Sequence, residues 1–167
     1  MNDRTIALIG PMGAGKTSVG RRVAKRLGRR FVDTDAAIAV EHGPIPELFA
    51  SLGEPGFRGI EREVVQRELR AGGVVSLGGG AVLDASTRAA LADCTVVLLT
   101  VSDAAVAQRL ASDRRPLLTD GIDSWRRIAA EREPVYRALA DVVVDTSRLP
   151  MTRIAEELAV QLQEEPA

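Results

Sequence analysis

The stretch Gly10-Pro-Met-Gly-Ala-Gly-Lys-Thr17 decides the fold of this chain. It fits the pattern G-x-x-x-x-G-K-[ST] without a mismatch, and it stands between an apolar run, Thr5 to Ile9, and a helical pattern. Glycine lets the backbone turn tightly enough for successive N–H groups to face an anion. The helix that follows adds unpaired N–H groups and the positive end of its dipole. We therefore expect a phosphate-binding loop (P-loop) here, and not an ordinary turn between a strand and a helix.

The motif predicts a nucleoside triphosphate as ligand, together with its metal ion. Lys16 is expected to reach the β- and γ-phosphates. The Thr17 hydroxyl is expected to occupy one coordination position on Mg²⁺. A triphosphate site alone leaves open whether the protein is a kinase, an ATPase or a nucleotide switch.

Composition limits the class of protein. A chain of 167 residues with 46% hydrophobic residues suits one soluble domain, spanning 1–167. The 22 basic and 23 acidic residues nearly cancel, which argues against a broad nucleic-acid surface. One cysteine, Cys94, excludes an internal disulfide and suits the cytoplasm. Because no leader pattern and no apolar run of about 18 residues is present, we expect neither export nor membrane spanning.

Strands and helices are expected to alternate along the chain. Strands are predicted at 5–9, 31–33, 73–77, 94–101 and 141–145. Helices are predicted after the P-loop, at 36–41, 45–52, 57–70, 86–91 and 102–110, from 123 or 124 to 139, and from 150 onward. Ser86 and Ser102 are expected to cap two of them. Alternation of this kind predicts a doubly wound, mostly parallel sheet of five strands with helices on both faces.

Four segments are expected to meet at one edge of this sheet, because ligands of such sheets bind at the carboxyl ends of the strands. They are the P-loop, Asp33 to Asp35, Gly78 to Gly80, and a surface loop from Ser112 to Gly121. Asp33 and Asp35 could hold Mg²⁺ through water and orient a hydroxyl nucleophile. The alternative is that Thr34 or Asp35 only caps a helix.

Two arginines and a glycine run bear on the second substrate. Arg58 at a helix start gains nothing from the dipole, so it makes more sense as a ligand of a carboxylate or phosphate. Arg132 by itself reads as a solvated surface charge. Three glycines, Gly78 to Gly80, exceed the need of a turn and suggest that a substrate or a backbone approaches closely. Ser76 stands near the point where ATPases and switches usually carry an acidic residue, which weakens both readings.

The chain resembles the shikimate kinase family in an ordered set of motifs from about Thr5 to Pro150. They are Gly10 to Ser18, Asp33-Thr34-Asp35, Ile45 to Phe49, Gly53-Glu54 with Phe57-Arg58 and Glu61, Ser76 to Gly80, Arg115-Pro116-Leu117-Leu118, and Arg132-x-Pro134-x-Tyr136. Many families share the P-loop, whereas the ordered set is specific. The resemblance implies a P-loop nucleoside-monophosphate-kinase-like, three-layer α/β fold. It also implies a lid at about 112–121 and a substrate-binding segment at about 34–61.

The resemblance further implies transfer of the ATP γ-phosphoryl group to the 3-hydroxyl of shikimate, in aromatic amino-acid biosynthesis, with Mg²⁺ bound. The implied catalytic residues are Lys16, Asp35 and Arg115. The implied substrate residues are Asp35 at the ring hydroxyls, Arg58 and Arg132 at the carboxylate, and Gly79 at the ring. The implied nucleotide residues are Gly13, Ala14, Gly15, Lys16, Thr17, Ser18, Arg115, Arg148 and Pro150, with Arg109 near the adenine, and the implied metal residues are Thr17 and Asp33. The lid is short, with only Ser112-Asp113-Arg114 before Arg115.

Two kinds of alternative stay open. A kinase of the same fold acting on gluconate would also use an arginine for its carboxylate, and one acting on a nucleoside monophosphate shares the P-loop. A non-catalytic ATP-binding regulator would bind ATP without depending on an acceptor. The main expectation is a cytoplasmic monomer that binds ATP and shikimate and binds neither nucleic acid nor membrane.

Overall fold

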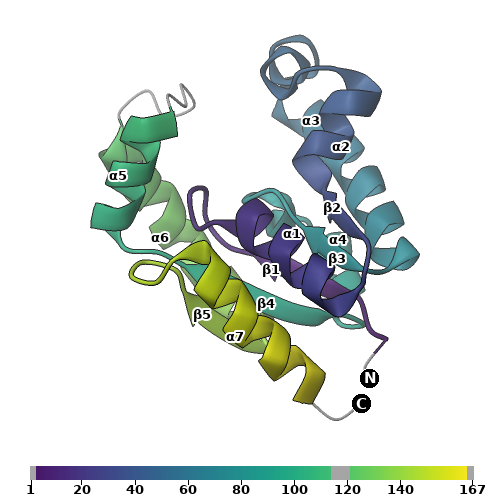
Figure 1. Cartoon of the computed structure of the whole chain (residues 1–167). Coiled ribbons are helices and arrows are strands. Elements are labelled where there is room, and N and C mark those ends of the chain that lie inside the picture. Colours follow the sequence, from purple (N-terminus) through teal and green to yellow (C-terminus); the bar gives the residue numbers. More distant parts are fainter. Residues whose placement is uncertain (1–2, 114–120, 165–167) are drawn as a thin grey trace.

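The computed structural model describes residues 3–113 and 121–164, and its centre is one parallel sheet (Figure 1). The strands are β1 (Ile6–Ile9), β2 (Phe31–Asp33), β3 (Val74–Ser76), β4 (Thr95–Thr100) and β5 (Val142–Asp145). They lie in the order β2-β3-β1-β4-β5, and all neighbouring pairs are parallel. The predicted five-stranded parallel sheet is confirmed. Because β1 is central, the P-loop that follows it opens at the middle of the sheet's carboxyl edge.

Helices cover both faces of the sheet. They are α1 (Lys16–Leu27), α2 (Thr34–His42), α3 (Ile45–Ala71), α4 (Ala85–Leu91), α5 (Asp103–Asp113), α6 (Ile122–Leu139) and α7 (Met151–Glu164), with a short 3-10 helix η1 (Ala81–Leu83). Side chains of α1 and α7 pack with Ile6 and Leu8 in one apolar cluster. Side chains of α3, α4 and α6 pack with Ala7 and Ile9 in another. Successive side chains of β1 therefore pack alternately into two apolar cores, as expected for a strand buried on both faces.

Two arms rise beyond the carboxyl edge of the sheet. Figure 1 shows α2 with the first half of α3 on one side of the P-loop, and α5 with α6 on the other. The first arm has its own small apolar cluster, made by Ile38, Leu48, Phe57 and Val64. It contains the segment 34–61, which the resemblance assigns to substrate binding. No helix within the described ranges is long and apolar enough to cross a membrane.

The region 45–71 differs from the expectation of two helices with a gap before Phe57. α3 runs through it and is interrupted only at Gly53, which has φ 68° and ψ 176°. Such a conformation favours glycine. Pro55 follows two residues later, in the first turn of the resumed helix. Its missing N–H costs nothing there, because the first N–H groups of a helix have no partner within the helix. The expected helix start was therefore wrong by a few residues, and Arg58 lies one turn inside the helix.

Capping also differs at one helix. α4 begins at Ala85, because the Asp84 side chain accepts a hydrogen bond from the Thr87 N–H at 2.9 Å. The Ser86 hydroxyl donates to the same carboxylate, so the prediction of Ser86 as the cap was wrong. At α5 the Ser102 hydroxyl accepts from the Ala105 N–H at 3.2 Å, which confirms that cap. At α4, an aspartate two residues before Ser86 is therefore the cap.

The segment between α5 and α6 is shorter than the loop 112–121 that was predicted. α5 continues to Asp113, so Ser112 and Asp113 are helical. α6 then begins at Ile122, directly after Gly121. The residues between, 114–120, lie outside the described residues, and so does the predicted lid arginine, Arg115.

Candidate functional site

The P-loop backbone requires glycine at two positions. Gly10 has φ 141°, and a Cβ built there would lie 2.3 Å from the carbonyl oxygen of Leu99. Gly15 has φ 91°, and its Cβ would lie 2.6 Å from the Met151 side chain. The positive φ favours glycine at both positions, and at Gly10 the backbone of Leu99 also leaves no space for a side chain. The motif glycines thus allow the loop to pass directly over β4 and against α7.

Lys16 and Thr17 open α1 at the end of this loop. The Lys16 ammonium donates to the carbonyl oxygens of Gly10 at 2.7 Å and Pro11 at 3.0 Å, so its charge lies across the loop. The Thr17 hydroxyl donates to Oδ2 of Asp33. Oδ1 of Asp33 accepts from the Ala36 N–H at 3.0 Å, which makes Asp33 the N-cap of α2.

The Thr17 hydroxyl and the Asp33 carboxylate form an oxygen pair beside the loop. Mg²⁺ prefers such oxygen ligands and takes few of them from protein in phosphate sites, where water and phosphates supply the rest. The residues present therefore fit the metal that accompanies a nucleoside triphosphate. Asp33 serves in helix capping with one oxygen and faces Thr17 with the other.

Asp35 does not cap α2, because Asp33 does, and Thr34 accepts from the Gly78 N–H at 3.3 Å. The capping alternative for these two residues was therefore wrong. The Asp35 carboxylate lies against the glycine turn, since a Cβ on Gly78 would stand 2.6 Å from its Oδ1. Burial, and then repulsion by Asp33, raise the pKa of Asp35, while the charges of Lys16 and Arg58 oppose the rise.

Arg58 reaches the same turn from α3. Its Nη1 lies 2.7 Å from Oε1 of Glu61, and its Nη2 lies 3.5 Å from Oε1 of Glu54. The Glu61 side chain is only 4% exposed, and burial raises its pKa while the bond to Arg58 lowers it. The carbon of the Arg58 guanidinium also lies 5.4 Å from the centre of the Phe57 ring. The argument that Arg58 is unfavourably placed at a helix start does not apply, because Arg58 lies inside α3. Its charge is paired there with Glu61 and Glu54.

Arg132 approaches the turn from α6. A Cβ on Gly79 would stand 3.3 Å from its Nη1, and 3.6 Å from the hydroxyl oxygen of Tyr136. That hydroxyl donates to the Gly79 carbonyl oxygen at 2.5 Å. Tyr136 is fully buried, and burial raises its pKa. Arg132 is therefore no isolated surface charge, since it lies where the turn and a buried tyrosine meet.

Each glycine of the run Gly78 to Gly80 leaves space for one charged side chain. Gly78 adjoins Asp35, Gly79 adjoins Arg132, and Gly80 adjoins Arg58, whose Nη2 would stand 2.5 Å from an added Cβ. The expected close approach of a substrate stays a prediction; in the structure these side chains lie nearest the run, with the Gly10 carbonyl oxygen 3.6 Å from a Cβ built on Gly79. Three elements that are distant in sequence thus present one carboxylate and two guanidinium groups at a single turn.

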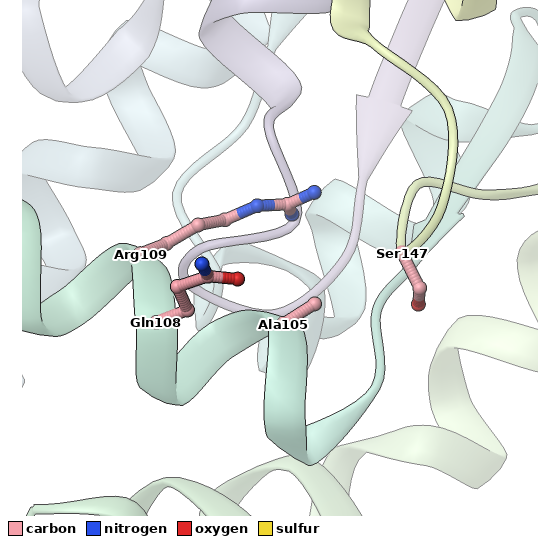
Figure 2. A pocket seen from close by; sticks show the side chains of 4 residues that line it. All are labelled: Ala105, Gln108, Arg109 and Ser147. Carbon is pink, nitrogen blue, oxygen red and sulfur yellow. The ribbon is translucent and has the colours of Figure 1, made fainter.

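A shallow pocket lies on the other side of the P-loop. Figure 2 shows Ala105, Gln108 and Arg109 on α5 and Ser147 on the turn after β5, which together line it. The predicted adenine residues Arg148 and Pro150 follow Ser147 and are exposed. Arg109 donates through Nη1 to the Gly13 carbonyl oxygen at 2.6 Å, which joins this pocket to the P-loop.

Three comparisons with known proteins agree. The family model described as shikimate kinase matches residues 12–163. A shikimate kinase of Stenotrophomonas maltophilia is 47% identical over 163 residues, which cover 94% of this chain and 91% of the relative. A solved structure of shikimate kinase from Acinetobacter baumannii in complex with shikimate superposes with a TM-score of 0.87 at 35% identity, covering 98% of this chain and 96% of that one. A gluconokinase from Sinorhizobium meliloti has a TM-score of 0.63 at 21% identity, over 98% of each chain, which shows a shared fold only.

Proposed function

The chain belongs to the shikimate kinase family, and on that premise we propose how its own residues carry out the reaction. It is a P-loop enzyme that phosphorylates shikimate with ATP, a step in aromatic amino-acid biosynthesis. The observation that carries the assignment of residues is the meeting of Asp35, Arg58 and Arg132 at the glycine turn beside the P-loop.

The acceptor has a carboxylate and ring hydroxyl groups, and the site offers partners for both. We assign the carboxylate to Arg58 and Arg132, because guanidinium groups bind carboxylates with two parallel hydrogen bonds. Glu61 already balances the charge of Arg58, so Arg132 is needed to make this part of the site attractive to an anion. Gly79 is assigned to the face of the ring, since it lies between Arg132 and Tyr136, where an added Cβ would be 3.3 Å from Arg132 Nη1.

Asp35 is assigned to the reacting hydroxyl, which we take to be the 3-hydroxyl. A general base works best when its pKa approaches the operating pH, and burial moves the pKa of Asp35 in that direction. The positive charges of Lys16 and Arg58 oppose the rise in the pKa of Asp35, because they favour the ionised carboxylate. As the bond between the hydroxyl oxygen and the γ-phosphorus forms, the hydroxyl proton passes to Asp35, and the bond from the γ-phosphorus to ADP breaks.

The nucleotide is assigned to the P-loop. Backbone N–H groups of residues 13–18 surround the phosphates, and Lys16 neutralises the charge that develops on them. Thr17 and Asp33 hold Mg²⁺, which when bound neutralises phosphate charge and orients the transferred group. Arg148 and Pro150 flank the adenine beside the pocket of Figure 2. Arg115 carries the lid role that the resemblance implies.

The remaining assignments concern the molecule as a whole. We assign a single domain to 1–167, because all five strands join one sheet. The near balance of 22 basic and 23 acidic residues supports a protein that binds neither nucleic acid nor membrane. We also assign a cytoplasmic location and a monomer, and the one buried cysteine suits the cytoplasm.

One experiment tests the proposal. ADP release from Mg·ATP is measured in parallel with shikimate, gluconate, AMP or no acceptor. ADP release should depend on shikimate, and the product should be shikimate 3-phosphate. Equal release without an acceptor would favour an ATPase or a regulator, and faster release with gluconate would reassign the pair Arg58 and Arg132 to that acid.

A further inference from the structure

Three successive carbonyl groups of the P-loop each accept a hydrogen bond from a side chain of a different element. The bonds run to Met12 O from Trp125 Nε1 (2.7 Å), to Gly13 O from Arg109 Nη1 (2.6 Å), and to Ala14 O from Thr146 Oγ1 (2.7 Å). The donors belong to α6, to α5 and to the turn after β5. The family motifs include neither Trp125 nor Thr146, and the resemblance places Arg109 only near the adenine.

Two of the donors are buried, and the third, Arg109, is partly buried. Trp125 is 5% exposed and Thr146 is 0% exposed. Arg109 also donates to Thr146, to its carbonyl oxygen at 2.5 Å and its hydroxyl oxygen at 3.2 Å, and burial lowers the pKa of Arg109. Thr146 lies 3.1 Å from the Thr100 carbonyl oxygen as well, but its single proton has the shorter path to Ala14. Buried donors of this kind fix the carbonyl groups that they bind.

Fixing a carbonyl also fixes an N–H group. In a trans peptide the C=O of one residue and the N–H of the next point in opposite directions. Held carbonyls at Met12, Gly13 and Ala14 therefore turn the N–H groups of residues 13–15 away from the donors. The Ala14 N–H makes a long turn bond of 3.3 Å to Pro11 O, which a phosphate oxygen could replace. Residues 13–15 are the part of the loop assigned to the phosphates.

We propose that Trp125 and Thr146, with Arg109, are positioning residues that hold the P-loop in its phosphate-binding form by binding its carbonyl groups. This inference rests on the proposed function, because it assumes that the loop binds nucleotide phosphates. These residues act through the backbone and touch no phosphate themselves. They fix the direction of the phosphate-binding N–H groups before the nucleotide arrives, so that binding does not have to order the loop.

The test compares ligand affinities in the full-length protein. Trp125→Phe keeps an aromatic ring without the N–H donor, and Thr146→Val keeps the shape of threonine without the hydroxyl. Thr146→Ser, which retains the hydroxyl, is the matched control. Calorimetry gives the dissociation constants of Mg·ADP, AMP and shikimate, the last without nucleotide. Thermal unfolding of each variant checks that it is folded.

Trp125→Phe and Thr146→Val should each weaken ADP binding about three- to tenfold, the range expected from one hydrogen bond. The affinity for AMP, which lacks the β-phosphate, should fall less than the affinity for ADP. The ratio of the two affinities, which measures the preference for ADP, should therefore fall. Shikimate affinity should stay at the wild-type value, and Thr146→Ser should bind ADP more tightly than Thr146→Val. A purely structural role would weaken ADP, AMP and shikimate together.

Two results would overturn the proposal. One is wild-type ADP affinity in both donor-free variants, and the other is an equal loss for all three ligands. If either variant fails to fold, the remaining one decides the question together with Thr146→Ser. Failure of the wild-type protein itself to bind ADP would instead contradict the proposed function, so the two failures are distinguishable.

Discussion

The phosphate side and the acceptor side of the site are built in opposite ways. In the proposed site, the phosphate side uses backbone N–H groups, and side chains behind the loop bind its carbonyl groups. The proposed acceptor side uses charged side chains, which lie against three glycines. The first arrangement fixes the direction of the N–H groups of the P-loop, whereas the second presents charged groups to the acceptor.

The difference bears on how each side responds to mutation. A P-loop held by several hydrogen bonds should lose affinity in small steps, because each donor contributes only part of the hold. The acceptor side should lose function in larger steps, because each charge there makes charge-assisted bonds to the acceptor or serves as the base. The substitutions below are ordered from the largest expected effect to the smallest.

Asp35→Asn should have the largest effect, because it keeps the shape of the side chain and removes its negative charge. Turnover should fall by roughly 10²–10⁴, the usual scale for a positioned base. Mg·ADP affinity should stay near that of the wild type, because Asp35 takes no part in holding the P-loop. Steady-state kinetics and ADP calorimetry measure the two effects. Normal turnover in this variant would remove Asp35 from the chemistry.

Arg132→Ala and Arg58→Ala should each weaken shikimate binding by about 1.5–3 kcal/mol, the range of charge-assisted hydrogen bonds, with ADP binding unchanged. The two should differ in stability. Arg58→Ala leaves Glu61 buried and unpaired, so its melting temperature should fall further. Adding Glu61→Gln to Arg58→Ala should restore part of the stability and none of the shikimate affinity. If shikimate titrates normally in Arg132→Ala, Arg132 is only a solvated charge.

Asp35 should also make stability depend on pH. Because its pKa is raised in the folded protein, the folded state holds the proton to higher pH than the unfolded chain does. The contribution of Asp35 to the free energy of unfolding is therefore fully present below the pKa of the unfolded chain, near 3.8. It is lost as the pH rises through the pKa of Asp35 in the folded protein. Asp35→Asn should be more stable than the wild type at neutral pH, and the advantage should shrink toward pH 4. A constant difference across a pH series of melting curves would contradict this account.

Gly59→Ala should have the smallest effect, and it should be favourable. Gly59 lies inside α3, and a Cβ built there meets no atom within 4 Å. Alanine should stabilise the helix by about 0.5–1 kcal/mol, because glycine loses more backbone entropy on folding. ADP and shikimate affinities should not change. A weaker shikimate affinity would show that this open space belongs to the acceptor and extends the charged side of the site.

The sheet could be predicted from sequence because its signals are local. Apolar runs such as Cys94 to Val101 mark buried strands, and the P-loop motif marks the strand that ends at the phosphate site. The order of the strands in the sheet was not predicted. The predicted helix starts were wrong where neighbouring residues could each begin or cap the helix. Asp84 took the cap expected from Ser86, and the helix resumed at Gly53 sooner than the pattern at Phe57 indicated.

The support of the P-loop could not be predicted, because it is entirely non-local. Trp125 and Thr146 bind carbonyls 113 and 132 residues away in sequence. Trp125 reads as one more apolar residue on a helix face, and Thr146 as the first residue after a strand. Neither residue belongs to a motif. Only the folded arrangement of α5, α6 and β5 around the loop brings their donors to it.

The hydrogen bond from Trp125 to Met12 also gives the protein an optical probe. Trp125 is the single tryptophan of the chain, so its indole dominates the fluorescence excited at long ultraviolet wavelengths. Indole emission responds to the hydrogen bond of its N–H group and to nearby charge, and here that N–H reports on the P-loop. Titration with Mg·ADP should change the emission, whereas shikimate alone should leave it nearly unchanged. Nucleotide occupancy could then be followed in real time in the unlabelled protein, by light from the residue that holds the loop.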